Sequence, residues 1–136
     1  MSTAFQSEDQ KKKGIALLGS TGSIGTQSLE VIEAYPDYFD LQVITANNNA
    51  DLLIEQAIKY RPNTVVIVNE DHLEKVKDAL WEHDIHVYAG KDVLCQVVEY
   101  GEVDVVLTAL VGYAGLKPTI HAINAKKNIA LANKET

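Results

Sequence analysis

The fold is decided by residues 15–25, which read IALLGSTGSIG. Four apolar residues come first, and three glycines follow with the spacing G-x-x-G-x-x-G. A short continuous apolar run is typical of a strand buried on both faces of a sheet. Gly19 permits a tight turn after that strand, Gly22 lets the backbone approach a ligand, and Gly25 permits close packing of the following helix. The stretch therefore predicts a strand, a glycine turn and a helix, in that order.

The same alternation continues along the chain. Near-continuous apolar runs predict six strands, at Ile15–Leu18, Leu41–Ala46, Val65–Val68, Val87–Tyr88, Val105–Leu107 and Ile129–Leu131. Stripes of helical period predict two helices between these strands. The first stripe consists of Ile24, Ser28, Val31, Ile32 and Tyr35. The second consists of Leu73, Val76, Leu80 and Trp81, and Asn69 or Asp71 is expected to cap that helix. Weaker helical patterns cover Asp51–Tyr60, Asp92–Tyr100 and Lys117–Lys126. Strands that alternate with helices predict an α/β fold with a Rossmann-like, doubly wound parallel sheet, in which Trp81 belongs to the core.

Length and composition limit the classes of protein that fit this chain. Its 136 residues supply one domain, and 46% hydrophobic against 23% charged residues excludes disorder of the whole chain. The polar residues 1–13 are expected to form a disordered tail, and residues 14–136 a single domain. Val105–Leu116 is too short for a membrane span and is interrupted by glycines, so no membrane is expected as a partner. The single cysteine, Cys95, excludes an internal disulfide, is expected to be buried, and fits a cytoplasmic protein.

Charge is distributed unevenly along the sequence. The net charge of −7, with no basic patch, argues against nucleic acid as a partner. Residues 14–104 carry 16 acidic and 5 basic side chains, whereas residues 105–136 carry four lysines and one glutamate. An anionic ligand would therefore meet the C-terminal segment most favourably.

The glycine turn has the pattern of a nucleotide-binding site. Free N–H groups at the start of a helix, together with its dipole, attract a pyrophosphate, and the hydroxyls of Thr21 and Ser23 are further donors. The turn lacks the G-K-[ST] ending of a nucleoside triphosphate loop, which disfavours ATP. The alternative interpretation is a glycine-rich turn that serves packing only.

The end of the second predicted strand indicates which dinucleotide binds. An NAD-binding fold normally places a carboxylate there for the ribose hydroxyls. This chain instead has three asparagines, Asn47, Asn48 and Asn49, while Asp40 lies at the other end of the strand and Asp51 is already in the next helix. No carboxylate would repel a 2′-phosphate, so NADP is favoured over NAD. Alternatively, the asparagines only turn the chain and cap the following helix.

Three motifs together resemble one enzyme family. They are the glycine turn, residues 109–119 (ALVGYAGLKPT) and residues 131–136 (LANKET). From about Lys13 to the last residue, the chain resembles the N-terminal NADPH-binding domain of the 1-deoxy-D-xylulose 5-phosphate reductoisomerases. The resemblance assigns Thr21, Gly22, Ser23 and Ile24 to the cofactor pyrophosphate, Asn47, Asn48 and Asn49 to the adenosine 2′-phosphate, Asn133 and Glu135 to the cofactor, and Lys134 to the substrate.

The resemblance also implies a reaction. Members convert 1-deoxy-D-xylulose 5-phosphate to 2-C-methyl-D-erythritol 4-phosphate in the non-mevalonate route to isoprenoids, with NADPH and a divalent metal, Mg or Mn, and they form homodimers. The metal-binding carboxylates of the family follow this domain, beyond the position of Thr136. No catalytic or metal-binding residue is therefore expected within this chain, which is expected to be inactive alone.

One departure from the family pattern concerns the asparagines. Many members show Gly-Lys-Asn or a similar basic triplet where this chain has Asn47, Asn48 and Asn49. A neutral amide replaces a cation, so the preference for NADP would depend on hydrogen bonds and on the missing carboxylate.

Two other functions fit parts of the sequence. A short-chain dehydrogenase also uses G-x-x-G-x-x-G, and Tyr113 and Lys117 have its Y-x-x-x-K spacing, but Gly115 and Pro118 disfavour the shared helical face that this pair requires. The other is a non-enzymatic nucleotide-sensing module.

The two histidines His83 and His86 could suggest a metal site. They have only Asp84 nearby and are interpreted as a solvated turn, not as metal ligands.

Overall fold

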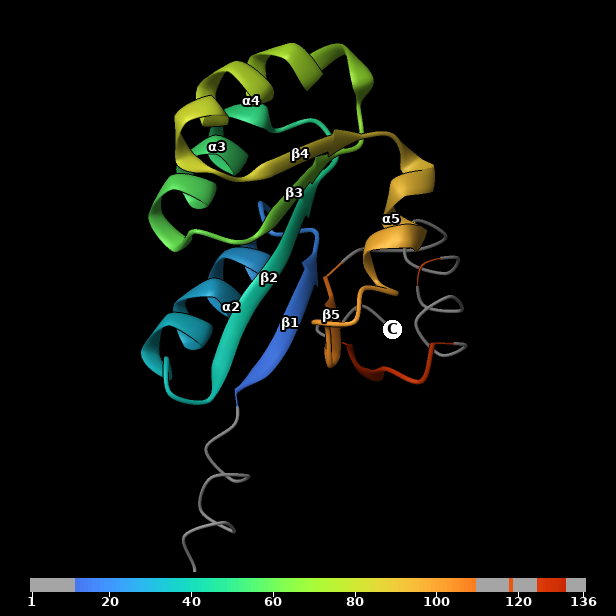
Figure 1. Cartoon of the computed structure of the whole chain (residues 1–136). Helices are drawn as coiled ribbons and strands as arrows, with labels where there is room; N and C mark the ends of the chain where they lie inside the picture. The colour runs from blue at the N-terminus through green and yellow to red at the C-terminus, as the bar shows by residue number, and fades with distance from the viewer. Residues whose placement is uncertain (1–11, 110–117, 119–124, 132–136) are drawn as a thin grey trace, which may run out of the picture.

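A computed structural model describes residues 12–109, 118 and 125–131. Its strands are β1 (Lys13–Leu18), β2 (Phe39–Ala46), β3 (Thr64–Ile67), β4 (His86–Ala89), β5 (Val105–Thr108) and β6 (Asn128–Leu131). Its α-helices are α2 (Ser23–Ala34), α3 (Ala50–Tyr60), α4 (Leu73–Leu80) and α5 (Lys91–Val97), with short 3₁₀ turns η1 (Glu70–His72) and η2 (Trp81–His83). Strands and helices alternate as the sequence predicts (Figure 1).

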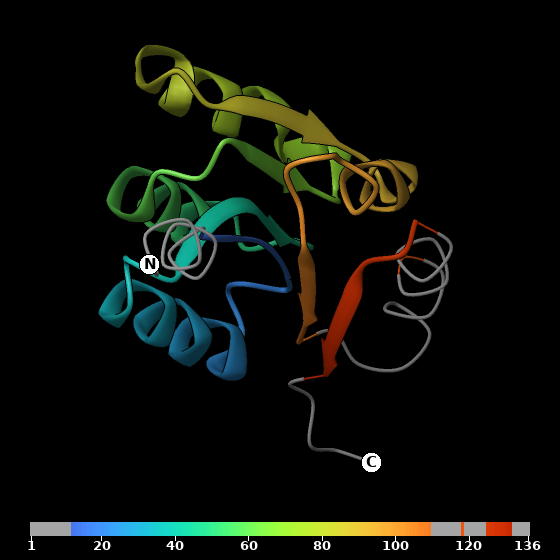
Figure 2. The same ribbon diagram turned by 60° about the horizontal axis from the view of Figure 1, so that its bottom comes forward.

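All the described strands join one parallel sheet in the order β4-β3-β2-β1-β5-β6. The central strand β1 pairs with β2 on one side, where Leu17 is opposite Ile44, and with β5 on the other, where Leu17 is opposite Leu107. Figure 2 shows β5 and β6 side by side beyond β1. The strand order reverses at β1, so the predicted doubly wound, Rossmann-like α/β class is confirmed. In such a sheet the ligand crevice lies at the carboxyl ends of the strands near the reversal.

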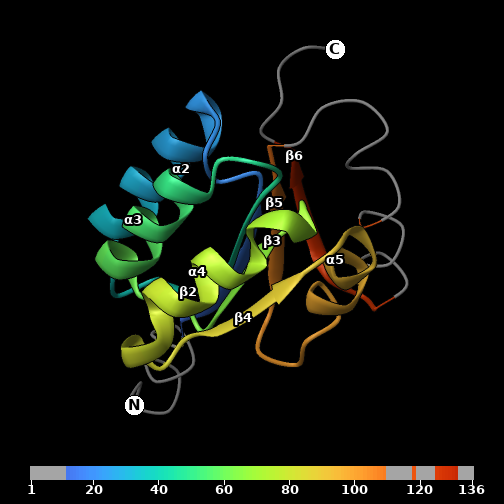
Figure 3. The ribbon, with the colours of Figure 1, turned by 90° about the horizontal axis from the view of Figure 1, so that it is seen from above.

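The helices cover both faces of the sheet. α2, α3 and α4 pack on one face through buried side chains that include Leu29, Leu53 and Val76, and α5 packs on the other through Leu94 and Val97. The view from above separates α2 and α3 on one side of the strands from α5 on the other (Figure 3). β1 and β3 are buried on both faces, which explains why they read as continuous apolar runs. Cys95 is buried in α5, as predicted.

Two expectations about helix faces are wrong. In α2 the buried residues are Gly25, Leu29 and Ile32, whereas Val31 and Tyr35 are 55% and 52% exposed. Ile32 is buried as predicted, but the buried face as a whole is turned from the predicted stripe toward Gly25 and Leu29. Gly25 causes the shift: a Cβ there would lie 2.1 Å from the carbonyl oxygen of Gly19, so the helix presses its glycine against the turn.

Trp81 is the second wrong expectation, because it is 82% exposed instead of belonging to the core. α4 buries Val76 and ends at Leu80, and Trp81 begins η2. A residue one position after Leu80 lies about 100° round the helix, outside the stripe that faces the sheet. Asn69, one of the two predicted caps, does cap the segment, because its side chain accepts a hydrogen bond from the N–H of Asp71 at the start of η1.

The remaining differences are at element ends. β1 begins at Lys13, within the stretch predicted to be a tail, and α5 ends at Val97, three residues before the predicted end. Residues 1–11 of the predicted tail lie outside the described residues, as does the predicted helix Lys117–Lys126 except for Pro118 and its last two positions.

Candidate functional site

The glycine turn joins β1 to α2 as predicted. Gly19 has a φ of 84°, in the left-handed region that favours glycine, and it directs the chain back over the sheet. Gly25 lies so close to the turn that an added Cβ would also stand 2.7 Å from the Cα of Ser20. Both glycines are therefore required by the backbone, in the roles that the sequence predicts for them.

Gly22 has a different environment. It is the residue before α2, and an added Cβ there would meet no described atom within 4 Å apart from its chain neighbours. Because Gly22 has no side chain, the start of α2 has no capping side chain, and its first turn contains no acidic residue. Ser23 is exposed, and Thr21 and Ile24 are half-buried around it. The first N–H groups of the helix, with the positive end of its dipole, are thus available to an anion.

A buried polar network that the sequence did not reveal holds the turn in place. The backbone N–H of Gly19 donates to Thr45 Oγ1 at 3.0 Å, and the N–H of Ser20 donates to the Thr45 carbonyl oxygen at 2.8 Å. The Ser20 hydroxyl donates to Gln56 Oε1 at 2.7 Å, and Gln56 Nε2 donates to the Ser20 carbonyl oxygen at 2.9 Å. Ser20, Thr45 and Gln56 are all buried. β2 and α3 therefore fix the position of the turn.

The three asparagines follow β2 and are all exposed. Asn49 caps α3, because its Oδ1 accepts a hydrogen bond from the N–H of Leu52 at 3.2 Å. Asn48 Oδ1 accepts one from Nδ2 of Asn69, a residue that follows β3, at 2.8 Å. The capping role that the sequence left open is therefore present at Asn49. It does not exclude a binding role, because the NH2 groups of Asn48 and Asn49 remain available to a ligand.

The carboxylate closest in sequence to the asparagines is paired. Lys75 Nζ on α4 contacts Asp51 Oδ1 at 2.5 Å, and both side chains are exposed. The hydrogen bond and the charge of Lys75 hold the pKa of Asp51 below its ordinary value of 3.8. Asp51 lies in the first turn of α3, past the end of β2, as the sequence indicates. Its negative charge is offset by a cation from the neighbouring helix.

Sheet topology brings the glycine turn and the asparagines to the same edge. β1 and β2 are parallel neighbours, and Gly19 and Asn47 each follow the carboxyl end of one of them. The order of strands reverses between β1 and β5, directly beside the turn. The sites predicted for a pyrophosphate and for a 2′-phosphate are therefore adjacent at the reversal point, where this class of sheet binds ligands.

The family model for 1-deoxy-D-xylulose 5-phosphate reductoisomerase matches residues 15–136. The chain belongs to this family. It is 64% identical over 126 residues to the reductoisomerase of Bacteroides thetaiotaomicron, covering 93% of this chain and 32% of the relative. It is 54% identical over 125 residues to that of Porphyromonas gingivalis, covering 92% and 32%. The chain thus spans about a third of the length of these reductoisomerases.

Solved reductoisomerases have the same fold. The enzyme of Zymomonas mobilis in complex with NADPH superposes with a TM-score of 0.85 at 35% identity, covering 92% of this chain and 33% of that one. A reductoisomerase in complex with NADPH, fosmidomycin and magnesium gives a TM-score of 0.84 at 31% identity, covering 90% and 30%. The predicted resemblance is confirmed, and it favours a reductoisomerase domain over a short-chain dehydrogenase or a sensing module.

Several residues that the resemblance to the reductoisomerases assigns lie outside the described residues. These are Asn133, Lys134 and Glu135, and also the Tyr113 and Lys117 of the dehydrogenase alternative. Within residues 12–109, 118 and 125–131, no group of three histidine, cysteine or carboxylate side chains lies close enough to hold a metal. No helix in this part of the chain is long and apolar enough to cross a membrane.

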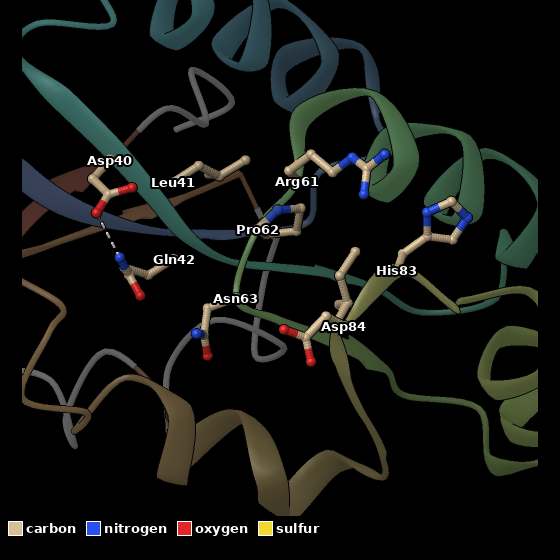
Figure 4. A pocket seen from close by; sticks show the side chains of 9 residues that line it. Asp40, Leu41, Gln42, Arg61, Pro62, Asn63, His83 and Asp84 are labelled. Carbon is tan, nitrogen blue, oxygen red and sulfur yellow. Dashed lines mark hydrogen bonds between the residues drawn. The ribbon is translucent and has the colours of Figure 1, made fainter. Parts of the chain in front are cut away.

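A pocket of about 300 Å³ lies at the opposite edge of the sheet (Figure 4). Its lining comes from β2 near its amino end and from the segments directly before β3 and β4: Asp40, Leu41, Gln42, Arg61, Pro62, Asn63, His83, Asp84 and Ile85. Gln42 Nε2 donates to Asp40 Oδ2 at 2.8 Å within it. Ligands of doubly wound sheets bind at the carboxyl ends of the strands, so this pocket is not the candidate dinucleotide site of the reductoisomerase fold.

Proposed function

We propose that the chain is an NADPH-binding domain. In this proposal Thr21, Gly22, Ser23 and Ile24 hold the cofactor pyrophosphate, and Asn47, Asn48 and Asn49 hold the adenosine 2′-phosphate. The observation that carries the proposal is the position of these two segments after the neighbouring strands β1 and β2, at the reversal of strand order. The reductoisomerase from Zymomonas mobilis, which is similar over 92% of this chain, is in complex with NADPH.

The described residues fit the phosphates of the cofactor. The space at Gly22 is open, and α2 begins without a capping or acidic side chain, as a pyrophosphate requires. At Asn48 and Asn49 the side-chain oxygens each accept a hydrogen bond from the protein, whereas the NH2 groups have no partner among the described residues and can meet a ligand. NH2 groups donate and phosphate oxygens accept, so the polarity is correct for a 2′-phosphate.

The activity of the whole protein is part of the same proposal. As in the family, it would convert 1-deoxy-D-xylulose 5-phosphate to 2-C-methyl-D-erythritol 4-phosphate, with the hydride coming from NADPH. Asn133 and Glu135 would contact the cofactor, and Lys134 would hold the phosphosugar. The divalent metal, Mg or Mn, would be bound by residues that follow Thr136, and the whole protein would be a homodimer. The described residues do not fit a metal site, so no metal step is assigned to them.

Calorimetric titration of the chain with NADPH and with NADH tests the cofactor proposal. We expect tighter binding of NADPH, because no carboxylate follows β2 to bind a free ribose hydroxyl and repel a phosphate. Equal affinity for the two cofactors, or a preference for NADH, would contradict the assignment of the asparagines. Failure to bind either one would contradict the proposed function itself.

A further inference from the structure

We propose that Asn69 is a positioning residue for the 2′-phosphate of NADPH, because it orients the side-chain amide of Asn48. The inference rests on the proposed function. Asn69 was predicted only as a possible helix cap, and it follows β3, one strand further from the glycine turn than the asparagines that follow β2. Its backbone N–H donates to the Asn47 carbonyl oxygen at 2.9 Å, and that of Val68 donates to the Ala46 carbonyl oxygen at 2.9 Å. The two chain segments therefore continue side by side past the ends of their strands.

The orientation of each amide follows from a group that can only donate. A backbone N–H has no acceptor capacity, so the Asp71 N–H, at 3.0 Å from the side chain of Asn69, requires the oxygen of that side chain. The Asn69 NH2 group must then lie on the other branch, where it donates to Asn48 at 2.8 Å. That contact requires the oxygen of Asn48 in turn. The Asn48 NH2 group is consequently left for a ligand.

A different hydrogen bond orients the side-chain amide of Asn49 in the same way. The N–H of Leu52 on α3 donates to its Oδ1, which leaves the Asn49 NH2 group as the available donor. Two adjacent side chains thus present donors. A 2′-phosphate only accepts hydrogen bonds at neutral pH, whereas a ribose 2′-hydroxyl both donates and accepts. Fixed donor polarity therefore favours NADPH over NADH without a formal charge.

The charges around the asparagines increase the effect of amide orientation on the binding of a phosphate. Glu70 and Asp71 follow Asn69 directly, and Asp51 follows the asparagines, so the nearby ionised side chains are largely acidic. Lys75 offsets Asp51. If the Asn48 amide were free to turn, its oxygen would also face the phosphate in part of the population. Asn69 removes that orientation before the cofactor binds.

The test is a double-mutant cycle in which the measured quantity is the ratio of the Kd values for NADH and NADPH. Calorimetry gives the Kd of NADPH and of NADH for the parent chain, Asn69→Ala, Asn48→Ala and the double variant. We expect Asn69→Ala to weaken NADPH binding about three- to tenfold, the range for ordering one side chain, and to change NADH binding less than about twofold. In the Asn48→Ala background, Asn69→Ala should leave the preference unchanged. A loss of NADPH affinity that persists in that background would overturn the proposal, as would an equal loss for both cofactors.

A second variant separates positioning from capping. Asn69→Asp keeps an oxygen for the Asp71 N–H but replaces the donor to Asn48 by an acceptor, so we expect a larger loss of NADPH affinity than with Asn69→Ala. Unchanged NADPH affinity in Asn69→Asp would overturn the proposal. Asn63→Ala is the matched control, because Asn63 is an exposed asparagine directly before β3 and so at the opposite edge of the sheet from Asn69; this variant should bind both cofactors as the parent chain does. If the parent chain prefers NADPH and the Asn69 variants bind both cofactors with the same affinities as the parent, only this inference is contradicted. If the parent chain binds neither cofactor, the proposed function and this inference are both contradicted.

Discussion

The Ser20 hydroxyl donates a hydrogen bond to Gln56 Oε1 at 2.7 Å, and Gln56 Nε2 returns one to the Ser20 carbonyl oxygen at 2.9 Å. The two residues lie 36 positions apart and are both buried. One glutamine on α3 thus satisfies a donor and an acceptor of the same turn residue. Since buried polar groups require partners, this pair holds the glycine turn against α3 in one position.

Gln56→Leu should destabilise the protein by about 1 to 3 kcal/mol, because the Ser20 hydroxyl loses its acceptor inside the core. Urea unfolding followed by circular dichroism measures this change. Glu55→Leu, at the exposed neighbouring position of the same helix, is the control and should change stability by less than about 0.5 kcal/mol. Equal stability of the two variants would mean that the Ser20–Gln56 pair contributes little.

Gly22→Val should abolish NADPH binding and leave the fold intact. A side chain at this position has room in the described structure, and it would enter the space proposed for the pyrophosphate. Calorimetry measures the binding and circular dichroism the fold. Gly101→Val, a glycine that also has open space, should fold and bind normally. If Gly22→Val binds as tightly as the parent chain, the glycine turn is not the pyrophosphate site.

Gly25→Ala should behave in the opposite way to Gly22→Val. The added Cβ would stand 2.1 Å from the Gly19 carbonyl oxygen, so α2 and the turn must separate. We expect a lower midpoint of thermal unfolding even without cofactor, because overpacking against backbone costs about 1 to 3 kcal/mol. An unchanged midpoint would show that α2 can move away from the turn at little cost.

Asn48→Lys should raise the affinity for NADPH. A cation facing a 2′-phosphate makes a charge-assisted hydrogen bond, worth about 1 kcal/mol more than a neutral one. The gain should decrease as salt is added and should be absent for NADH. Titrations of both cofactors at two salt concentrations measure it. An equal gain for NADH would place Asn48 away from the 2′-phosphate.

Lys75→Met should raise the pKa of Asp51 back toward 3.8, because Lys75 is the main cause of its lowered value. A carboxylate whose folded pKa is lowered adds stability above its unfolded pKa, and this stability is lost as pH falls through the folded value. The parent chain and the variant should therefore differ slightly in stability at neutral pH, and the difference should disappear as the pH falls below 3.8 and through the lowered pKa of Asp51. NMR titration of the Asp51 carboxyl carbon reports the pKa directly. Lys77→Met, on the same helix but outside this ion pair, should leave that titration unchanged.

The chain alone should bind NADPH without consuming it. Magnesium needs several converging oxygen ligands, and the described residues bring no such group together. Binding should therefore be independent of divalent ions, and no NADPH should be oxidised in the presence of 1-deoxy-D-xylulose 5-phosphate and Mg or Mn. Absorbance at the nicotinamide band follows the reaction. Steady oxidation that requires both substrate and metal would show that the chemistry lies within these residues.

The elements of the fold could be predicted because each depends on near neighbours in the sequence. β1, the glycine turn and the start of α2 follow from an apolar run and from backbone conformations that glycine permits, as the φ of Gly19 shows. The apolar stripe of α2 did not give the face that the helix buries, although the predicted packing role of Gly25 indicated part of it. Its position depends on the contact of Gly25 with Ser20, and this contact exists only after the helix packs on the turn.

The sequence by itself determined the fold class, the glycine turn, the absence of a carboxylate after β2 and the resemblance to the reductoisomerases. The tertiary structure decided which polar groups meet. Asn69 reaches Asn48 across 21 positions, and Gln56 reaches Ser20 across 36, because β3 and α3 pack beside the segments that follow β2 and β1. Such contacts depend on strand order and register, which bring together residues that no local pattern relates. Proximity between distant segments therefore oriented the amide of Asn48, whereas the local cap at Leu52 oriented that of Asn49.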